Sequence, residues 1–241
     1  MRIEGSIAFV LALGACSQRL GPGTAAKAPS AVPAAMVEVS GGKQIAAVGA
    51  PLDQPVVVQV NDAHGTPVAG ASVAFHASNG VVFQPGVGLT GSDGQFTFSV
   101  TLGSMAGRYQ IAATTAGADG KTVEVKIEEI ALGLQQNQGK ELINRYCSRC
   151  HDMESTPERV SNFDNLTEKP HAFSDGEFLN KMTDADMAAI ITRGGPALGK
   201  SAEMPPYGHL LGQAAINAIV AYIRAVSDPP YRKGELIYAQ R

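Results

Sequence analysis

The chain has little cysteine, little charge and no long hydrophobic run. Only three of its 241 residues are cysteines, the charged residues make up 17%, and the formal net charge is −3. So weak a charge imbalance creates no strong field for nucleic acid, and we expect no nucleic-acid partner. Beyond the N-terminal segment, no apolar run reaches the ~18 residues that a membrane helix requires.

Two of the cysteines stand in the segment Cys147-Ser148-Arg149-Cys150-His151. Two thiols three positions apart on one helical turn can reach both vinyl groups of a single porphyrin, and the histidine is then placed beneath the iron. The spacing predicts one covalently bound haem c, anchored by Cys147 and Cys150, with His151 as the proximal ligand. A zinc site would need about two further ligands, and the chain has no second cysteine pair. A thioredoxin-like dithiol would need a βαβ setting, which is not evident nearby.

The third cysteine, Cys16, follows a short basic start and the apolar run 7–13. This layout predicts a signal peptide over residues 1–15, too short to span a membrane. The ending Leu13-Gly14-Ala15-Cys16 resembles the lipobox of bacterial lipoproteins, although Glu4 departs from a positive start. The resemblance implies cleavage before Cys16, its lipidation, and an anchored protein on the periplasmic side of a bacterial membrane, on the outer membrane or at the cell surface. The alternative is an ordinary export signal with an incidental cysteine.

Residues 16–35 are rich in Ala, Pro and Gly, a composition typical of a flexible tether. Between residues 36 and 131 the pattern changes to short strands separated by Gly, Asp and Asn, which predicts seven or so strands in an antiparallel sandwich. The clearest runs are 56–60, 71–75, 95–100 and 122–127. The stretches "DAHGTPVAGASVAFHASNG", "LTGSDGQFTFSV" and "GRYQIAATTAG" resemble the bacterial immunoglobulin-like domains of invasin-type surface proteins. That resemblance implies an all-β immunoglobulin-like fold.

Residues 136–228 have helical patterning, after a boundary at 135–140. Helices are predicted over 139–146, from the N-cap Thr183 to the stop at Gly194, and over 213–226. A six-coordinate haem needs a second axial ligand. The candidates are His171, His209, Met153, Met182, Met187 and Met204.

Met153 is too close to His151 to cross to the other face of a haem, and Met182 and Met187 occupy positions typical of core packing. Met204 lies in the extended segment 201–208, stiffened by the two prolines that follow it. Gly139, the haem motif, Met204-Pro205-Pro206 and the final helix resemble a monohaem class I cytochrome c, an all-α fold. The resemblance implies that Met204 is the distal ligand and that Gly139 allows close approach near Tyr222. His209 is the runner-up, and His171 is expected to face solvent.

Methionine–histidine ligation raises the haem potential, and a filled sixth site leaves no open position at the iron. We therefore expect an electron-transfer protein rather than an enzyme, with redox proteins as donor and acceptor and the membrane as a further partner. Three alternatives stay open. They are a cytochrome subunit of a dehydrogenase or reductase, a peroxidase-like enzyme, and an adhesin-like protein whose haem is secondary.

The tail 229–241 contains Gly234-Glu235-Leu236-Ile237, similar to the Gly139-Lys140-Glu141-Leu142-Ile143 stretch that leads into the haem motif. Gly139 precedes Cys147 by eight positions, and the same interval from Gly234 falls just past Arg241. The similarity predicts the start of a second cytochrome c domain. The alternative is a short amphipathic tail.

Overall fold

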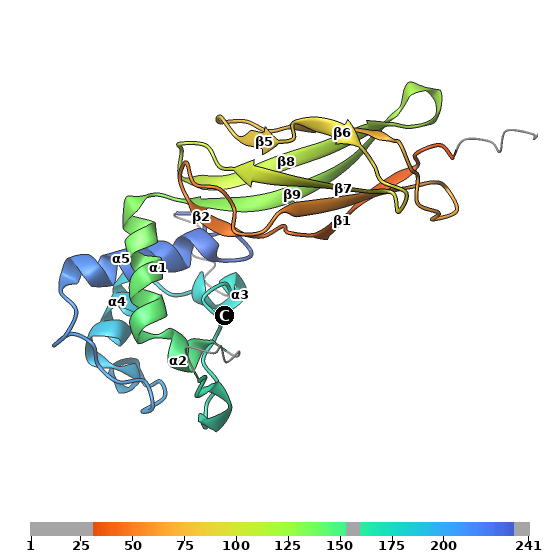
Figure 1. The fold of residues 1–241 in the computed structure, drawn as a ribbon. Coiled ribbons are helices and arrows are strands. Elements are labelled where there is room, and N and C mark those ends of the chain that lie inside the picture. Colours follow the sequence, from red (N-terminus) through yellow and green to blue (C-terminus); the bar gives the residue numbers. More distant parts are fainter. Residues whose placement is uncertain (1–30, 153–159, 234–241) are drawn as a thin grey trace, which may run out of the picture. The chain divides into compact units, whose positions relative to one another are not determined.

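The computed structural model describes residues 31–152 and 160–233, which lie within one compact unit (Figure 1). It contains a β-sandwich, from Ala35 to Leu132, followed by a helical domain, from Leu134 to Val226. The predicted signal peptide, Cys16, Met153 and the tail from Gly234 lie outside the described residues.

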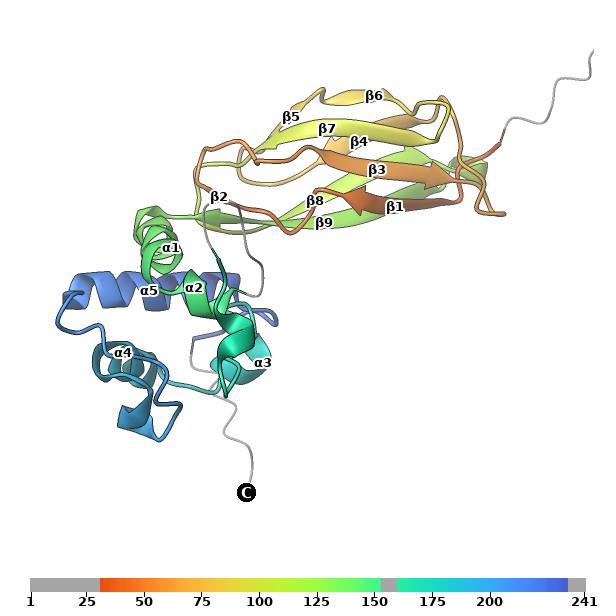
Figure 2. The same cartoon turned by 60° about the horizontal axis from the view of Figure 1, so that its bottom comes forward.

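The sandwich consists of two sheets with strand orders β1-β3-β7-β5 and β2-β9-β8-β4-β6 (Figure 2). Neighbouring strands run antiparallel except for β2 and β9, which run parallel. The expectation of an antiparallel sandwich is therefore corrected at this one pair. The structure has nine strands in its described part, where the sequence predicted about seven. The strands β2, β5 and β6, of three residues each, are too short for an alternating pattern to show. The strand bounds are β1 Ala35–Ser40, β2 Ile45–Ala47, β3 Val56–Asn61, β4 Ser72–His76, β5 Val82–Gln84, β6 Val87–Leu89, β7 Gln95–Thr101, β8 Gly107–Ala116 and β9 Thr122–Leu132.

Alternation along the strands builds the core of the sandwich. Every second residue of β3 and of β7 is buried, as expected for strands with one face toward an apolar interior. Phe75 of β4 and Phe98 of β7 meet there with ring centroids 4.0 Å apart. The last four residues of β9 are all buried, and this end of the strand contacts α1 and α5 as well as the sandwich. Both faces of β9 are therefore covered at the junction of the two domains.

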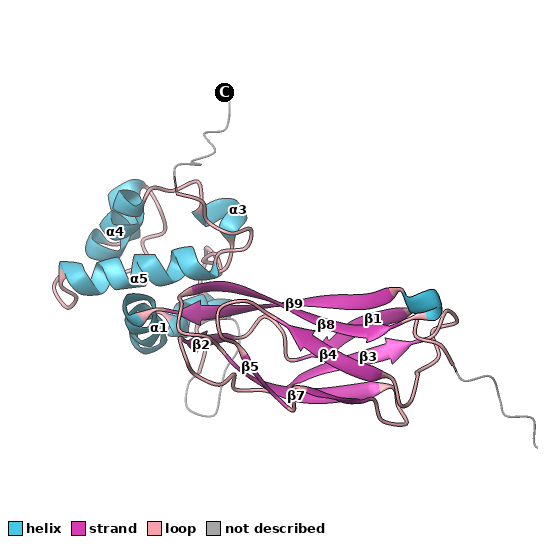
Figure 3. Cartoon of the chain, turned by 90° about the horizontal axis from the view of Figure 1, so that it is seen from above, coloured by secondary structure: helices cyan, strands magenta, loops and turns pink. Residues whose placement is uncertain are grey.

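The helical domain contains five α-helices within the described residues (Figure 3). They are α1 Leu134–Tyr146, α2 Ser148–His151, α3 Gly176–Leu179, α4 Asp184–Arg193 and α5 Gln213–Val226. The bounds of α5 match the prediction, and Thr183 caps α4 by accepting a 3.0 Å hydrogen bond from the Asp186 amide, as predicted. The predicted start of the first helix at residue 139 is wrong, because α1 begins at Leu134, one residue after β9 ends. The Gly133 amide closes this helix start by donating a 2.9 Å hydrogen bond to the Gln136 side chain.

Helix α1 packs across α5 at Gly139. A Cβ atom at this position would lie 2.0 Å from the carbonyl oxygen of Ala218 and 2.9 Å from the Cβ of Tyr222. Only a glycine therefore allows the two backbones to approach this closely, and the expectation of a close approach near Tyr222 is confirmed. Around the crossing, Ile143 of α1 and Ile219 and Ile223 of α5 are buried in a shared apolar core.

Candidate haem site

The predicted haem motif lies where α1 ends and the short helix α2 begins. Cys147 is the residue between the two helices, and Cys150 and His151 belong to α2. The buried Ser148 hydroxyl holds this corner by contacting the carbonyl oxygens of Ile143 and Asn144 at 3.2 and 2.8 Å. Both cysteines are free thiols and are partly buried. Burial, together with the neighbouring Cys150, raises the pKa of Cys147 to about 11, so this thiol is protonated at neutral pH.

The imidazole of His151 is oriented by a backbone carbonyl group. Its Nδ1 lies 3.3 Å from the carbonyl oxygen of His171, and its ring stacks on Phe173 at 4.5 Å between centroids. Burial lowers the pKa of His151, which favours the neutral ring. A neutral imidazole that donates Nδ1–H to a carbonyl keeps Nε2 available as a metal ligand. The geometry therefore suits the role of proximal ligand.

All four residues predicted to bind haem line one cavity of about 540 Å³: Cys147, Cys150, His151 and Met204. Its walls also include apolar side chains of α4 and α5, among them Ile190, Ile191, Ile219 and Ile223. The volume is in the range of ligand pockets, about 300–1,000 Å³. The donor set of this cavity is a thiol pair, an available imidazole and a thioether, and its walls are aliphatic. This combination fits a haem.

The other candidate ligands are placed differently. Met182 and Met187 also line the cavity, and Met187 is buried in the core beside α5. His209 is exposed and does not line it. His171 was expected to face solvent, but it lines the cavity as well, with a side chain that is 45% exposed. Its imidazole pairs with Asp175 at 2.7 Å and stacks on Phe178. The structure thus brings three methionines to the cavity, of which Met204 alone lies in a loop outside the helices and their immediate flanks.

The segment that carries Met204 packs against the C-terminal end of α4. The Gly195 amide donates a 3.0 Å hydrogen bond to the Met204 carbonyl oxygen, and the Tyr207 amide donates one of 2.9 Å to Ile191. Gly194 has a φ of 82°, in the left-handed region. A Cβ atom at Gly195 would lie 2.0 Å from the carbonyl oxygen of Ser201. The glycine pair predicted as a helix stop therefore also makes room for the Met204 loop.

Two residues of this loop had no place in the prediction from sequence. The hydroxyl of Tyr207 donates a 2.9 Å hydrogen bond to the carbonyl oxygen of Tyr146, the residue just before the haem motif. The carboxylate of Glu203 accepts hydrogen bonds from the Thr167 and Glu168 amides at 2.9 and 3.4 Å. These contacts join segments that are far apart in sequence, so no local sequence pattern predicts them.

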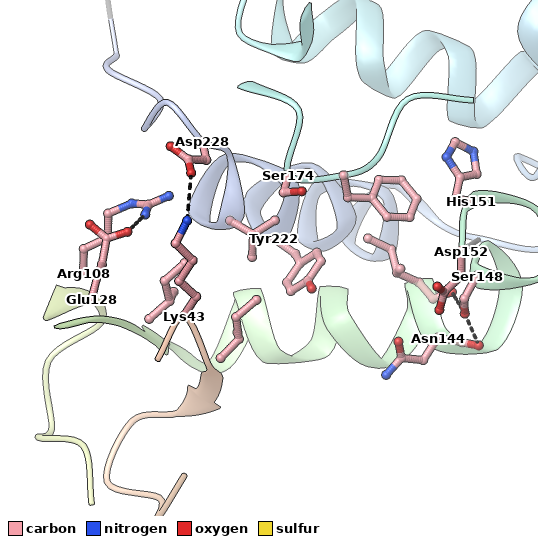
Figure 4. Close-up of a pocket in the computed structure, with 15 residues that line it drawn as sticks. Lys43, Arg108, Glu128, Asn144, Ser148, His151, Asp152, Ser174, Tyr222 and Asp228 are labelled. Atoms are coloured by element: carbon pink, nitrogen blue, oxygen red, sulfur yellow. Dashed lines mark hydrogen bonds and ion pairs between the residues drawn. The ribbon is translucent and has the colours of Figure 1, made fainter. Parts of the chain in front are cut away.

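A second cavity, of about 480 Å³, lies between the sandwich and the helical domain (Figure 4). His151 lines it as well as the first cavity, so the imidazole stands between the two. The sandwich contributes Lys43, Arg108 and Glu128, and the helical domain contributes Tyr222 and Asp228 among others. The cavity thus extends from residues of the sandwich at one end to His151 of the helical domain at the other.

Across residues 31–152 and 160–233, none of the helices combines the length and apolar character needed to cross a membrane.

Comparison with protein families assigns both domains. Residues 44–128 match the model of the bacterial Ig-like domain (group 1), and residues 135–223 match that of cytochrome c oxidase, cbb3-type, subunit III. The chain therefore contains a bacterial immunoglobulin-like domain followed by a cytochrome c domain. The second match supports a haem-binding, electron-transfer role for residues 135–223. No curated protein matches the chain.

Several solved structures are similar to part of the chain. The D00–D0 domain of intimin is 15% identical with a TM-score of 0.31, over 44% of this chain and 51% of that one. The adhesin InvE of Yersinia pseudotuberculosis is 17% identical with a TM-score of 0.31, over 42% and 32%. Invasin, titled a bacterial integrin-binding protein, is 18% identical with a TM-score of 0.33, over 44% and 21%. The chain thus spans about half of the first structure and less of the other two.

Proposed function

We propose that this protein is a membrane-anchored c-type cytochrome that transfers one electron at a time through a single covalently bound haem. Cys147 and Cys150 would form the thioethers, and His151 and Met204 would be the axial ligands. The observation that carries the proposal is that these four side chains, taken from two distant segments, line one cavity. When bound there, the haem supplies a reversible Fe(III)/Fe(II) couple.

The chain's own residues favour electron transfer over catalysis at the iron. The His171 carbonyl holds His151 in one orientation, which fixes a ligand without any rearrangement between redox states. A thioether from Met204 would occupy the sixth position and favour the reduced iron, because methionine–histidine ligation raises the potential. Aliphatic walls from α4 and α5 exclude water and act in the same direction.

Anchoring and partners follow from the N-terminal pattern. Lipidation of Cys16 would place the protein on the periplasmic side of a bacterial membrane or on the outer membrane. Donor and acceptor would be redox proteins at that surface. A Cys16→Ser variant should then move from the membrane fraction to the soluble fraction and lose the acyl mass, whereas recovery of wild-type protein as a soluble periplasmic species would contradict the anchor.

One observation favours a second candidate function, the cytochrome subunit of a larger oxidoreductase. The matching cytochrome model is described as a subunit of cytochrome c oxidase, so domains of this kind occur in multisubunit enzymes. The catalytic centre would then lie on another polypeptide. Purification under mild conditions separates the two: a carrier is recovered alone, and a subunit is recovered with a redox enzyme whose activity needs it.

The ligand assignment is tested by replacing each cavity methionine in the full-length holo-protein. Met204→Ala should abolish the weak long-wavelength absorption band of sulfur bound to ferric iron, and should allow imidazole or CO to bind readily. Met182→Leu and Met187→Leu are matched controls, because both residues line the same cavity and should keep the band. Loss of the band in either control, with retention in Met204→Ala, would assign the ligand elsewhere.

A further inference from the structure

The loop 161–171 connects the two sides of the predicted haem site. Its C-terminal end supplies the His171 carbonyl that orients His151, and its middle supplies the two amides that donate to Glu203. Glu203 immediately precedes Met204. One continuous segment therefore contacts the predicted proximal ligand at its C-terminal end and the neighbour of the predicted distal ligand at its middle.

The loop is itself made rigid by a lysine. The ammonium group of Lys169 donates hydrogen bonds to three carbonyl oxygens of its own loop, those of Phe163, Asp164 and Leu166, at 3.0, 2.8 and 2.9 Å. It also lies 5.5 Å from the centre of the Phe163 ring. Three charge-assisted hydrogen bonds to one ammonium group close the loop on itself. The Thr167 and Glu168 amides are thereby held in position to meet a carboxylate.

The contact of Glu203 with this loop differs from the other contacts of the Met204 segment. The amides of Gly195 and Tyr207 tie the segment to the C-terminal end of α4. The hydroxyl of Tyr207 ties it to Tyr146, the last residue of α1. The hydrogen bonds of Glu203 run 36 and 35 positions back along the chain, to the segment that follows the haem motif. Removing the carboxylate would leave the Met204 loop bonded to α4 and α1 but not to the loop 161–171.

We propose that Glu203 is a positioning residue for the axial methionine: its carboxylate fastens the Met204 loop to the loop that orients His151, and so keeps the thioether on the iron. This proposal rests on the proposed Met204 ligation. Without the fastening, the thioether would leave the iron more often, and an external ligand would compete better for the sixth position. The effect is on the population of the ligated state, because the Glu203 carboxylate, which also lines the cavity, is held by the Thr167 and Glu168 amides.

The test compares Glu203→Ala, Glu203→Gln and the control Glu177→Ala in the full-length holo-protein. Glu177 is an equally exposed carboxylate in the same domain, on α3. Imidazole binding to the ferric protein, followed by loss of the sulfur-to-iron band, is the readout. Glu203→Ala should tighten imidazole binding about three- to tenfold, the equivalent of losing one ordinary hydrogen bond. Glu203→Gln keeps an acceptor oxygen and should fall between it and wild type, and Glu177→Ala should match wild type.

A second variant tests the same contact by changing the loop 161–171 instead of Glu203. Lys169→Met frees the three carbonyl groups and should loosen the amides that Glu203 contacts, with a change in the same direction. Imidazole affinities of Glu203→Ala and Lys169→Met equal to those of wild type, in protein with full haem content, would overturn the proposal. A failure of the ligand assignment looks different, because wild type would then lack the sulfur-to-iron band and Met204→Ala would change nothing.

Discussion

The hydroxyl of Tyr207 donates a 2.9 Å hydrogen bond to the backbone carbonyl oxygen of Tyr146. The two rings lie 6.3 Å apart at a tilted angle. Tyr207 belongs to the loop of the predicted distal ligand, and Tyr146 is the last residue of α1 before Cys147. Burial raises the pKa of Tyr207, so its hydroxyl stays protonated and able to donate over the physiological range. This bond therefore links the two segments between which the haem must fit.

Removing that hydroxyl should weaken the holo-protein without changing its fold. Tyr207→Phe keeps the ring and loses one hydrogen bond, so the free energy of unfolding should fall by about 0.5–1.5 kcal/mol. Tyr146→Phe is the matched control, because the Tyr146 carbonyl remains and its hydroxyl makes no hydrogen bond within the described residues. Denaturant titration of both variants measures the difference. Equal stability of the two variants would show that the bond contributes nothing.

The glycine at the crossing of α1 and α5 should be far more sensitive than its exposed neighbour. Gly139→Ala places a Cβ atom 2.0 Å from the Ala218 carbonyl oxygen, which forces the helices apart and should lower the free energy of unfolding by about 1–3 kcal/mol. Gln138→Ala adds an alanine one position earlier on the exposed face of α1, where the change in helix propensity is small. Thermal unfolding of the two variants measures both stabilities, and so separates the effect of the Cβ clash from that of helix propensity. A Gly139→Ala protein as stable as wild type would mean that the crossing can widen freely.

The sequence predicted the parts of this fold that have a local signal. The apolar spacing of residues 213–226 and the Thr183 cap located α5 and the start of α4 because amphipathic period and capping chemistry are encoded within one helix. The start of α1 was missed because residues 134–138 are mostly exposed and have no apolar period. Gln136 caps the start of this helix by accepting a hydrogen bond from the Gly133 amide, and the helix follows directly from β9. Its start therefore depends on the junction of the two domains.

The candidate site divides in the same way. Cys147, Cys150 and His151 were predicted from a five-residue motif, and Met204 from its extended, proline-flanked setting together with the resemblance to cytochrome c. The roles of the His171 carbonyl and the Glu203 carboxylate were not predicted, because the first is itself a backbone group and the second is bound by backbone amides. A backbone acceptor has no sequence signature, so only the folded chain shows which one is used.

Glu129 should make the stability of the sandwich depend on pH. Its side chain is fully buried, and one carboxyl oxygen accepts a 2.6 Å hydrogen bond from the Gln44 amide, while the other has no hydrogen-bond partner among the described residues. Burial, and then the charges of Glu38 and Glu128, raises its pKa from 4.5 to about 8. Between these values the unfolded chain releases the proton and the folded chain keeps it. The free energy of unfolding should therefore fall as pH rises through this window, with a slope approaching about 1.4 kcal/mol per pH unit.

The Glu129→Gln variant tests this assignment. An amide keeps an oxygen for Gln44 and does not ionise, so the pH dependence between about 5 and 8 should flatten and the variant should exceed wild type in stability at the alkaline end. Glu124→Gln, an exposed carboxylate on the same strand, should leave the slope unchanged. Chemical denaturation across this pH range gives both curves. A wild-type curve that is flat or rising between pH 5 and 8 would contradict a buried, protonated Glu129.

Two cationic side chains of the sandwich face the helical domain, and they should differ strongly in their contribution to stability (Figure 4). Arg108 is mostly buried, pairs with Glu128, and donates to the carbonyl oxygens of Ser227 at 2.5 Å and of Ala225 at 3.5 Å. Its charge thus meets the free carbonyl groups at the C-terminal end of α5, where a cation is favourable. Lys43 reaches Asp228 only at 4.0 Å, and both side chains are largely exposed.

Arg108→Ala removes these hydrogen bonds and leaves Glu128 without its cation, so the free energy of unfolding should fall by about 1–3 kcal/mol. Lys43→Ala removes an exposed ion pair and should cost about 0–0.5 kcal/mol. Arg108→Lys should recover only part of the loss, because one ammonium group cannot serve Glu128 and the Ser227 carbonyl in the planar arrangement of a guanidinium. Denaturation of the holo-protein, monitored at the haem and in the far ultraviolet, measures all three. If Arg108→Ala unfolds at the same denaturant concentration as Lys43→Ala, the two domains are not coupled through Arg108, and the sandwich does not stabilise the end of α5.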